Sequence, residues 1–254
     1  MRNAAQRVNP GAADPCSVIA VCGLAFEAAI AAGPGIVTVC GLGSERLAAR
    51  VEKSLAQEAR QCRGIISFGI AGGLDPALRP GACVIADEIV EIVEIVTPAR
   101  RFPVDAGWLQ ALRTCVPDAT QGTVAGVDQP MLDAADKARL RQSSGARAVD
   151  MESHRAALIA QRHGVPFAAC RVVADPAHRS LPSTAAVGLR DDGTMALMQT
   201  LRCLMRQPGQ LPALIRLASD AWAAQRTLRA VRSHMGVALA MPRHPGHTEA
   251  GDRY

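Results

Sequence analysis

Aromatic residues are scarce in this chain of 254 residues, of which they make up 3%. Its 28 Lys and Arg residues are spread along the sequence among 23 Asp and Glu residues and form no dense cluster. Binding of single-stranded nucleic acid needs aromatic side chains on which bases stack, and binding of a phosphate backbone needs clustered cations. The composition therefore argues against nucleic acid as a partner, despite the net charge of +5.

Long uninterrupted apolar runs are also lacking. Gly, Pro or a charged residue breaks every apolar stretch before it reaches the roughly 18 residues that a membrane span needs. Arg2 and Arg7 precede an apolar stretch near the N-terminus, but Asp14, Pro15 and Glu27 interrupt the pattern of a secretory signal. We therefore expect no transmembrane segment and a cytoplasmic location.

The eight cysteines include no C-x-x-C pair, and most of them lie inside apolar, strand-like runs. Cysteines in such positions behave as small buried hydrophobic residues in a reducing compartment. The six histidines show no metal-ligand spacing, so we expect no metal site.

Complete motifs for several common enzyme classes are missing as well. The sequence has no Walker loop, no H-E-x-x-H and no G-x-S-x-G. The stretch "GLGSER" has only the first two glycines of the dinucleotide fingerprint, with Arg46 in the third place. We therefore expect no dinucleotide or other cofactor.

What the sequence does contain is an alternation of short β-branched runs and longer helical patterns, in a chain that is 49% hydrophobic. The strands read as continuously apolar, which is typical of a sheet covered on both faces. We predict an α/β fold, a three-layer α-β-α arrangement with a central mixed, largely parallel sheet. One domain is expected over residues 16–240, between a disordered segment over 1–15 and a flexible tail over 241–254.

The predicted strands cover 17–23, 35–43, 64–73, 82–96, 122–128, 146–151 and 165–175. The predicted helices begin at Phe26 and cover 44–60, 106–116, 133–144 and 153–163, with two more in 194–234, divided at 207–212. The run over 82–96 is ambiguous, because the spacing of Glu88, Glu91 and Glu94 also fits a helix. Its density of Val and Ile favours a strand.

Residues that could take part in binding or catalysis occur where these strands end. Glu27 falls in the first turn of a helix, where a carboxylate either complements the helix dipole or serves a function. In "CGLGSER" the backbone amides of Gly41, Gly43 and Ser44 precede a helix and, with Arg46 beside them, are suited to an anion.

The stretch "GIAGGLDPALRPG" ends an apolar strand with Gly69, Gly72 and Gly73. Such glycines allow either a left-handed turn or the close approach of a ligand to the backbone, and the stretch alone does not separate these readings.

Asp150 and Glu152 stand two residues apart in "VDME", so they share one face if the strand continues that far. Arg171 lies in the apolar strand that ends at Asp175, and a buried arginine must find a carboxylate, for which Glu152 is the candidate. Either this is an ion pair that fixes the sheet, or these charges at strand ends form a site.

The segment "AVDMESHRAALIAQRHGVPFAACRVVAD", together with "GIAGGL" and "GLG", resembles the nucleoside phosphorylase and methylthioadenosine/S-adenosylhomocysteine nucleosidase superfamily. The resemblance runs from about residue 17 to about residue 205. Within the superfamily the chain is most similar to the hopanoid-associated phosphorylase branch, which is linked with removal of adenine from adenosylhopane.

The resemblance implies a set of residue roles. Met151 would pack on the ribose, and Glu152 would accept hydrogen bonds from its hydroxyls. Asp175 would protonate or hydrogen-bond the imidazole-ring nitrogen of the purine, so that the base leaves as a neutral molecule. Gly72 and Gly73 would lie against the substrate.

The nucleophile is left open by two departures from the family pattern. Glu27 lies one residue from the place of the glutamate that activates water in the hydrolytic branch. Ile70 stands where many phosphorylases have a phosphate-binding serine or threonine. The residues left to bind phosphate are Gly43, Ser44, Arg46 and Arg171.

We therefore expect phosphorolysis of a 5′-modified adenosine such as adenosylhopane, with inorganic phosphate as co-substrate. The alternative is a hydrolytic nucleosidase with Glu27 as base. A nucleoside-binding module without turnover is disfavoured, because Glu152, Arg171 and Asp175 are all present. Members of the superfamily are usually oligomers, so the resemblance also implies a homo-oligomer, whether dimer, trimer or hexamer.

Overall fold

The structure is a computed structural model that describes residues 17–41, 44–58, 62–94, 97–181 and 211–242. Four predictions lie wholly or largely outside these residues. They are the disordered segment over 1–15, the phosphate contact of Gly43, the first of the two helices expected within 194–234, and the tail, of which only Met241 and Pro242 are described.

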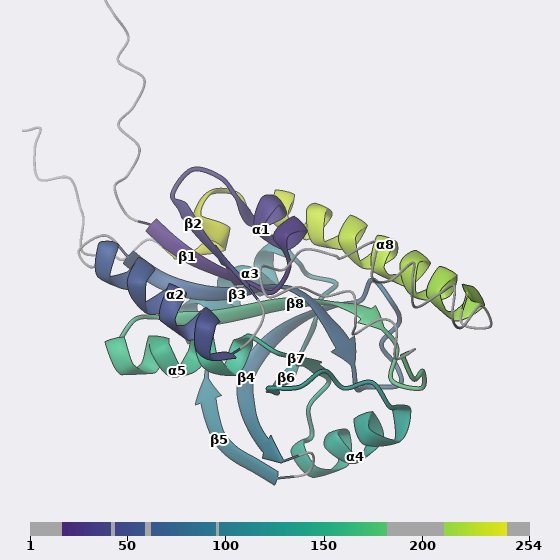
Figure 1. Cartoon of the computed structure of the whole chain (residues 1–254). Coiled ribbons are helices and arrows are strands. Elements are labelled where there is room, and N and C mark those ends of the chain that lie inside the picture. Colours follow the sequence, from purple (N-terminus) through teal and green to yellow (C-terminus); the bar gives the residue numbers. More distant parts are fainter. Residues whose placement is uncertain (1–16, 42–43, 59–61, 95–96, 182–210, 243–254) are drawn as a thin grey trace, which may run out of the picture.

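One eight-stranded mixed sheet forms the centre of the molecule (Figure 1). Its strands are β1 (Ser17–Cys22), β2 (Ile36–Cys40), β3 (Cys62–Gly73), β4 (Cys83–Glu94), β5 (Thr97–Pro103), β6 (Thr120–Gly126), β7 (Ala148–Asp150) and β8 (Phe167–Asp175). The order is β2-β1-β3-β7-β6-β4-β5, and β8 pairs with both β3 and β4. Most of these pairings are parallel, as predicted.

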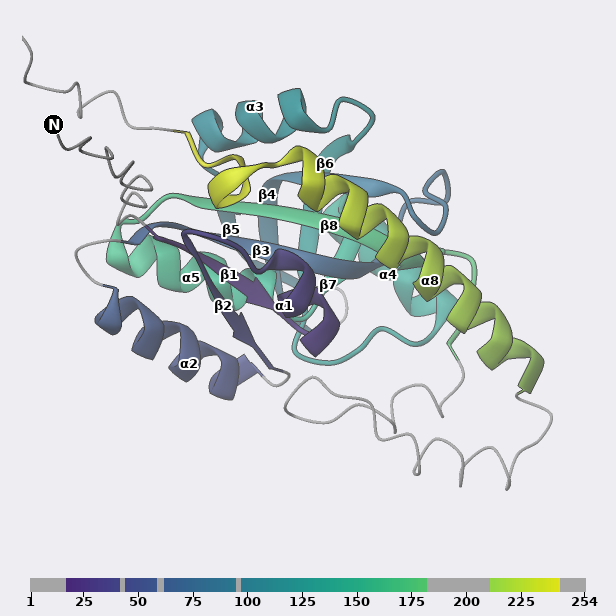
Figure 2. The same cartoon turned by 90° about the horizontal axis from the view of Figure 1, so that it is seen from above.

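Helices cover both faces of the sheet (Figure 2). They are α1 (Ala25–Ala31), α2 (Ser44–Gln57), α3 (Ala106–Cys115), α4 (Ala134–Ser144), α5 (Ser153–His163) and α8 (Leu211–His234), followed by the short 3-10 helix η2 (Val237–Ala240). One face packs against α2 and α5, the other against α1, α3 and α8. The predicted three-layer α-β-α fold is thereby confirmed.

The strand β1 shows why a strand that is covered by helices on both faces has a continuously apolar sequence. Ile19 and Val21 face the core under α2 and α5, whereas Val18, Ala20 and Cys22 face the core under α1 and α8. All these residues are fully buried. Because successive side chains point to opposite faces, a strand covered on both sides has no position for a polar residue without a partner.

Within the ambiguous run over 82–96, Cys83–Glu94 form a strand, β4, as the Val and Ile content predicted, and residues 95–96 lie outside the described residues. Its neighbour β5 was not predicted, because "TPARRFP" contains two prolines and no alternation of apolar and polar residues. This strand pairs with β4 along one edge of the sheet. Arg100 there lies 2.9 Å from Glu91, and Arg101 pairs with Glu88, so two of the three glutamates have cross-strand partners.

The long strands β3 and β4 bend so that the sheet closes on itself. β8 bridges them, pairing with β3 along most of its length and with β4 at Cys83–Ile85. At the end of β3, Gly72 is paired with Val149 of β7 on one side and with Asp175 of β8 on the other. This closure brings the ends of β7 and β8 together, although Asp150 and Asp175 are 25 positions apart in the sequence.

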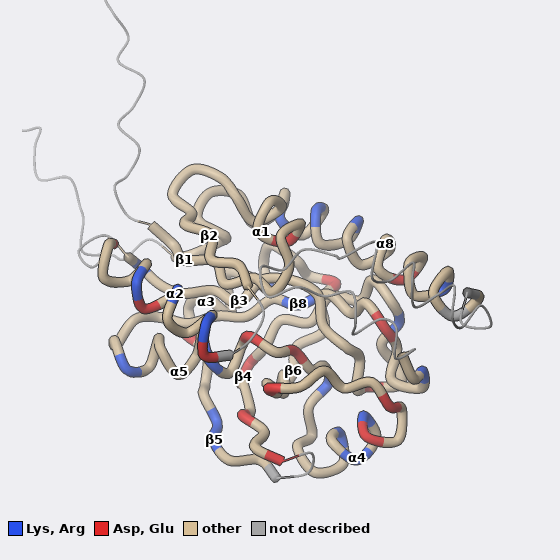
Figure 3. Tube along the Cα trace, viewed as in Figure 1, with Lys and Arg blue, Asp and Glu red and all other residues tan. Residues whose placement is uncertain are grey.

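Charged residues of both signs are interspersed along the described elements (Figure 3). In this part of the chain, no helix combines the length and the apolar character that crossing a membrane requires.

Trp108 of α3 fixes the C-terminal end of the fold. It is fully buried, and its indole nitrogen donates a hydrogen bond of 2.9 Å to the carbonyl oxygen of Leu239 in η2. A Cβ atom added to Gly64 of β3 would lie 2.7 Å from the Trp108 ring, so the packing leaves no room there. The indole thus holds α3, β3 and η2 together.

We predict that Trp108→Ala lowers the free energy of unfolding by about 3–5 kcal/mol, because it leaves a cavity and an unpaired buried carbonyl. Trp222→Ala is the matched control, since Trp222 on α8 is 60% exposed. It should cost less than about 1 kcal/mol. Urea unfolding measures both, and equal losses would contradict this account of Trp108.

Candidate active site

A cavity of about 190 Å³ lies at the carboxyl ends of β1, β3, β7 and β8. Ligands gather at this edge of open α/β sheets. The carboxylate-bearing residues among its lining are Glu27, Asp150, Glu152 and Asp175. Each of them is at least nine-tenths buried, so the cavity concentrates acidic groups where they are costly to ionise without partners.

Arg171 is the cation at the centre of this acidic cluster and is 1% exposed. Its Nη2 lies 3.1 Å from an oxygen of Glu152, the predicted partner. Its Nε is closer still to Asp150, at 2.7 Å from Oδ2, at ion-pair distance but not aligned for a hydrogen bond. Nη2 also donates to the hydroxyl of Ser67, and Nη1 donates to the carbonyl of Ile70 at 3.3 Å. All of these contacts are to groups of the protein.

Asp150 and Glu152 were expected to share a strand face only if the strand continued to Glu152, and that condition is not met. β7 ends at Asp150, and the chain turns directly into α5, with Glu152 at the N-cap position. The Asp150 carboxylate accepts hydrogen bonds from the backbone N–H of Glu152 at 3.2 Å and of Ser153 at 2.9 Å. It also accepts one from the Ser153 hydroxyl, so Asp150 fixes the start of the helix. Arg171, and not a common strand face, brings the two carboxylates together.

Glu152 is 6% exposed, and burial raises the pKa of its carboxyl to about 8. Arg171 opposes this rise, while Asp150 and Glu27 add to it because like charges disfavour ionisation. The carboxyl lies against the backbone of Gly23, where an added Cβ would come within 2.5 Å of Oε1. Glycine at that position therefore allows the end of β1 to approach Glu152.

Glu27 reaches back from α1 to the strand ends. Its Oε2 accepts hydrogen bonds of 2.8 Å from the N–H groups of Gly23 and Leu24, and its Oε1 accepts one of 2.7 Å from Ile70. Burial raises the pKa of Glu27, although Arg171 and these backbone donors oppose the rise. Glu27 thus caps its own helix and also lines the cavity. Its position is therefore consistent with both roles considered from the sequence, stabilisation of the helix start and a function in the site.

Asp175 is the last residue of β8 and is 7% exposed. Its Oδ2 is paired with the ammonium of Lys137, a residue of α4. Burial raises the pKa of Asp175, while the nearby Lys137 opposes the rise. Sequence reasoning missed Lys137, because in "DAADKARLRQSS" it is one of several charged residues on a helix.

The other predicted residues divide between the cavity and its surroundings. Met151 and Gly72 line the cavity, whereas Gly73 packs beside the backbone carbonyl of Asp175. Ser44 begins α2 and Arg46 is exposed on that helix. Gly43 lies outside the described residues, so the anion site expected at Gly43, Ser44 and Arg46 stays a prediction.

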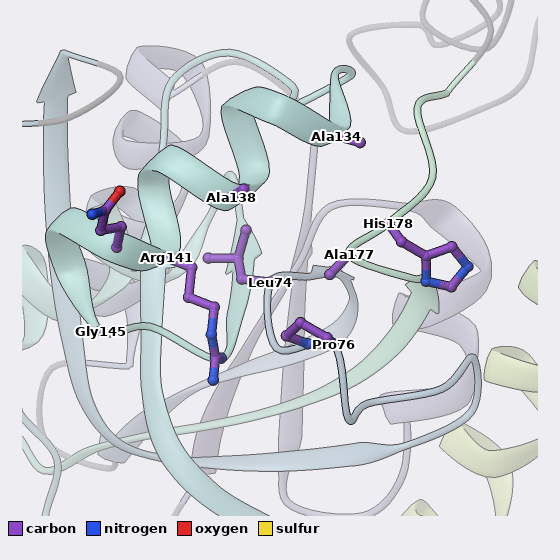
Figure 4. Close-up of a pocket in the computed structure, with 9 residues that line it drawn as sticks. Leu74, Pro76, Ala134, Ala138, Arg141, Gly145, Ala177 and His178 are labelled. Carbon is purple, nitrogen blue, oxygen red and sulfur yellow. The ribbon is translucent and has the colours of Figure 1, made fainter.

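A second cavity of about 500 Å³ is lined by residues of α4, the segment after β3 and the segment after β8 (Figure 4). Its described lining contains no carboxylate, and Ala134, Ala138 and Ala177 supply much of its wall. Its one guanidinium belongs to Arg141, which lies 3.2 Å from Asp75 and is therefore already paired. The acidic cavity, though smaller, is the one in which ionisable groups converge.

The described residues form no group of three or more His, Cys, Asp or Glu arranged to hold a metal ion. The charges of the acidic cavity are held instead by Arg171 and Lys137.

Fold and site together define a three-layer α/β protein with an acidic pocket at the carboxyl ends of its strands. Comparison of the sequence with known families then identifies the group: residues 16–202 match the model of the Phosphorylase superfamily. The chain belongs to this superfamily, which confirms the resemblance seen in the sequence. Membership of the hopanoid-associated branch stays a prediction.

The individual proteins to which the chain is similar share at most a quarter of their aligned residues with it. The chain is 25% identical to the 5′-methylthioadenosine/S-adenosylhomocysteine nucleosidase of Mycobacterium tuberculosis over 176 residues, 55% of this chain and 69% of the relative. The crystal structure of the corresponding nucleosidase from Neisseria meningitidis, in complex with methylthio-immucillin-A, aligns with a TM-score of 0.61 and 18% identity over 85% of this chain and 97% of its own. Futalosine hydrolase of Helicobacter pylori aligns with a TM-score of 0.62 and 15% identity over 87% of this chain and 97% of its own. These structures support the fold.

The raised pKa of Glu152 makes stability depend on pH. Since folding raises the pKa of this acid from 4.5 to about 8, its contribution to stability is full below about pH 4.5 and is lost as the pH rises to about 8. We predict that Glu152→Gln removes this loss, so that the free energy of unfolding of the variant rises relative to that of the wild type as the pH increases through that range.

Urea unfolding at pH 5, 6, 7 and 8 measures the difference. Met151→Leu is the control, since it alters the neighbouring residue but keeps every carboxyl, and it should retain the pH dependence of the wild type. Parallel curves for wild type and Glu152→Gln would show that Glu152 titrates normally.

Proposed function

We propose that the protein hydrolyses the N-glycosidic bond of an adenine nucleoside, releasing the free base and the sugar. The observation that carries the proposal is the acidic cavity itself, in which Arg171 is already engaged by Asp150 and Glu152. The names of the relatives support it, since the sequence relatives are adenosine-type nucleosidases and one structural neighbour is a hydrolase.

The cavity supplies a group for each part of such a substrate. The Glu152 carboxylate, oriented by Arg171, accepts hydrogen bonds from the ribose hydroxyls, and Met151 packs against the sugar. Asp175, whose pKa is raised by burial, gives a proton to the purine ring so that a neutral base departs.

Water fits this cavity better than phosphate. The cation beside the cavity, Arg171, already contacts Asp150, Glu152, Ser67 and the carbonyl of Ile70. Ile70 offers no hydroxyl, and its N–H is bonded to Glu27. Glu27 is therefore assigned as the base that takes a proton from the attacking water. Its Oε2 accepts two backbone hydrogen bonds, whereas Oε1 accepts one and has a second lone pair for that water. Phosphorolysis stays a prediction from the family resemblance.

The apolar part of the cavity wall indicates which kind of 5′ substituent the substrate carries. Val127, Met131 and Leu181 contribute apolar surface to its wall. Such a wall favours an apolar substituent over a charged one, because a charge there would lose its hydration without a partner. An adenosine with an alkylthio or larger hydrocarbon group fits this description, and adenosylhopane stays a prediction from the resemblance.

We predict that the protein releases adenine from 5′-methylthioadenosine at its full rate in phosphate-free buffer. Chromatography of free adenine measures the rate, with 0 and 50 mM added phosphate chosen as the two conditions. In ¹⁸O-labelled water the label should appear on C1 of the released sugar, because water is the nucleophile. Release that requires phosphate, with a sugar 1-phosphate as product, would establish phosphorolysis instead.

We predict that Glu27→Gln lowers kcat by about 10²-fold to 10⁴-fold, the usual contribution of a general base, with little change in the binding of a non-cleavable substrate analogue. Asp118→Asn is the control, since Asp118 is exposed in the turn before β6, at the opposite end of that strand from the cavity. Calorimetric titration with the analogue separates binding from turnover. A Glu27→Gln variant with wild-type kcat would remove Glu27 from the role of base.

A further inference from the structure

Lys137 is the least expected residue near the cavity, because it is a lysine with 0% exposure. Lysine is almost never fully buried unless it is paired. Its position is fixed by the start of α4, where Asp133 caps the helix through a hydrogen bond of 2.7 Å from the N–H of Ala135. The helix therefore presents the ammonium at a defined place.

The ammonium of Lys137 has three N–H donors, and the structure supplies three acceptors. One is Oδ2 of Asp175, and the others are the backbone carbonyls of Pro176 at 3.3 Å and Arg179 at 3.0 Å. All three acceptors belong to the end of β8 and the segment that follows it. Figure 4 shows α4 above this segment, with Ala134 and Ala138 on the helix and Ala177 and His178 below them.

This arrangement distinguishes the two oxygens of Asp175. Oδ2 accepts from Lys137, whereas Oδ1 accepts no hydrogen bond from any residue that the structure describes. Asp175 lines the acidic cavity, so Oδ1 is left for a ligand. In a protonated carboxyl, the oxygen that accepts from an ammonium is the carbonyl oxygen, and the proton sits on the other.

We propose that Lys137 is a positioning residue that places the acidic proton of Asp175 on Oδ1, toward the leaving base. The proposal rests on the proposed function, since it requires a base that leaves with a proton. In the step itself the Oδ1–H bond breaks, its electron pair stays on Oδ1, and an N–H bond forms on the purine ring. Lys137 then stabilises the carboxylate that remains.

The charges that face Asp175 come from three elements. Lys137 belongs to α4, Arg179 to the segment after β8, and Asp220 to α8, where it pairs with Arg179. Lys137 and Arg179 lower the pKa of Asp175, and Asp220 raises it, against the larger effect of burial. Loss of the Lys137 ammonium therefore raises the pKa of Asp175 further and weakens it as an acid.

The first test does not depend on activity. The side-chain ¹³C signal of Asp175, assigned by its absence from Asp175→Asn, is followed against pH in the wild type and in Lys137→Met. We expect the titration midpoint to move to higher pH by at least one unit in the variant. An unchanged midpoint would overturn the proposal, even if the protein proved to have no nucleosidase activity.

The second test compares two leaving groups in the intact protein. Lys137→Met should lower kcat for 5′-methylthioadenosine by about 10²-fold, because its base needs a proton, with KM little changed. With a 4-nitrophenyl riboside, whose phenolate leaves unprotonated, the loss should be within about threefold, since leaving-group acid catalysis no longer contributes. Equal losses on both substrates would show a structural role only, whereas a wild type inactive on both would contradict the proposed function.

Two further variants guard against a failure to fold. Lys137→Gln keeps a neutral donor to Oδ2 and should recover part of the lost kcat. In the Asp175→Asn background, Lys137→Met should cause no further loss of kcat, because the two residues act as a unit. Full additivity of the two losses would count against the proposal. Arg139→Met is the matched control on α4, since the side chain of Arg139 is 61% exposed, and it should leave all these quantities unchanged.

Discussion

The buried guanidinium of Arg171 is the interaction on which the rest of this structure depends. It lies between Asp150 at the end of β7 and Glu152 at the start of α5, and it is bonded to Ser67 and Ile70 of β3. Removing one member of such a cluster leaves an uncompensated buried charge, which typically costs about 3–5 kcal/mol. The same cation that joins three strands therefore also sets the orientation of the carboxylate assigned to the sugar.

The fold was largely predictable, because its signals are local. The runs of β1, β3 and β8 are predominantly apolar, with Ser67 and Arg171 as the polar residues in the middle of β3 and β8. The caps of α3 and α4 are aspartates. β5 was not predictable in this way, since it is held by pairing with β4 and by contacts of Arg100 and Arg101 with glutamates of that strand. Tertiary pairing decides the conformation of such a segment.

The candidate site was predictable in its residues but not in its geometry. Arg171 was identified as a charge within an apolar strand, and Glu152 and Asp175 as charges at strand ends, which requires only the order of the predicted elements. Asp150 lies closer to Arg171 than Glu152 does. The turn between β7 and α5 causes this arrangement, and the sequence did not predict that turn. Lys137 could not be predicted as a site residue, because a lysine on a helix is ordinarily exposed. Only the packing of α4 against the end of β8 buries it.

The two halves of the site are anchored to different parts of the molecule. Glu152 and Arg171 belong to the central sheet and the helix beneath it, whereas Asp175 depends on Lys137 from α4, a helix of 11 residues at the edge of the fold. Peripheral helices open locally at lower free energy than core strands. Under the proposed roles, a transient detachment of α4 would separate Lys137 from Asp175 and leave the contacts of Arg171 with Glu152 in place. The local stability of one surface helix would then determine how often Asp175 is held in position.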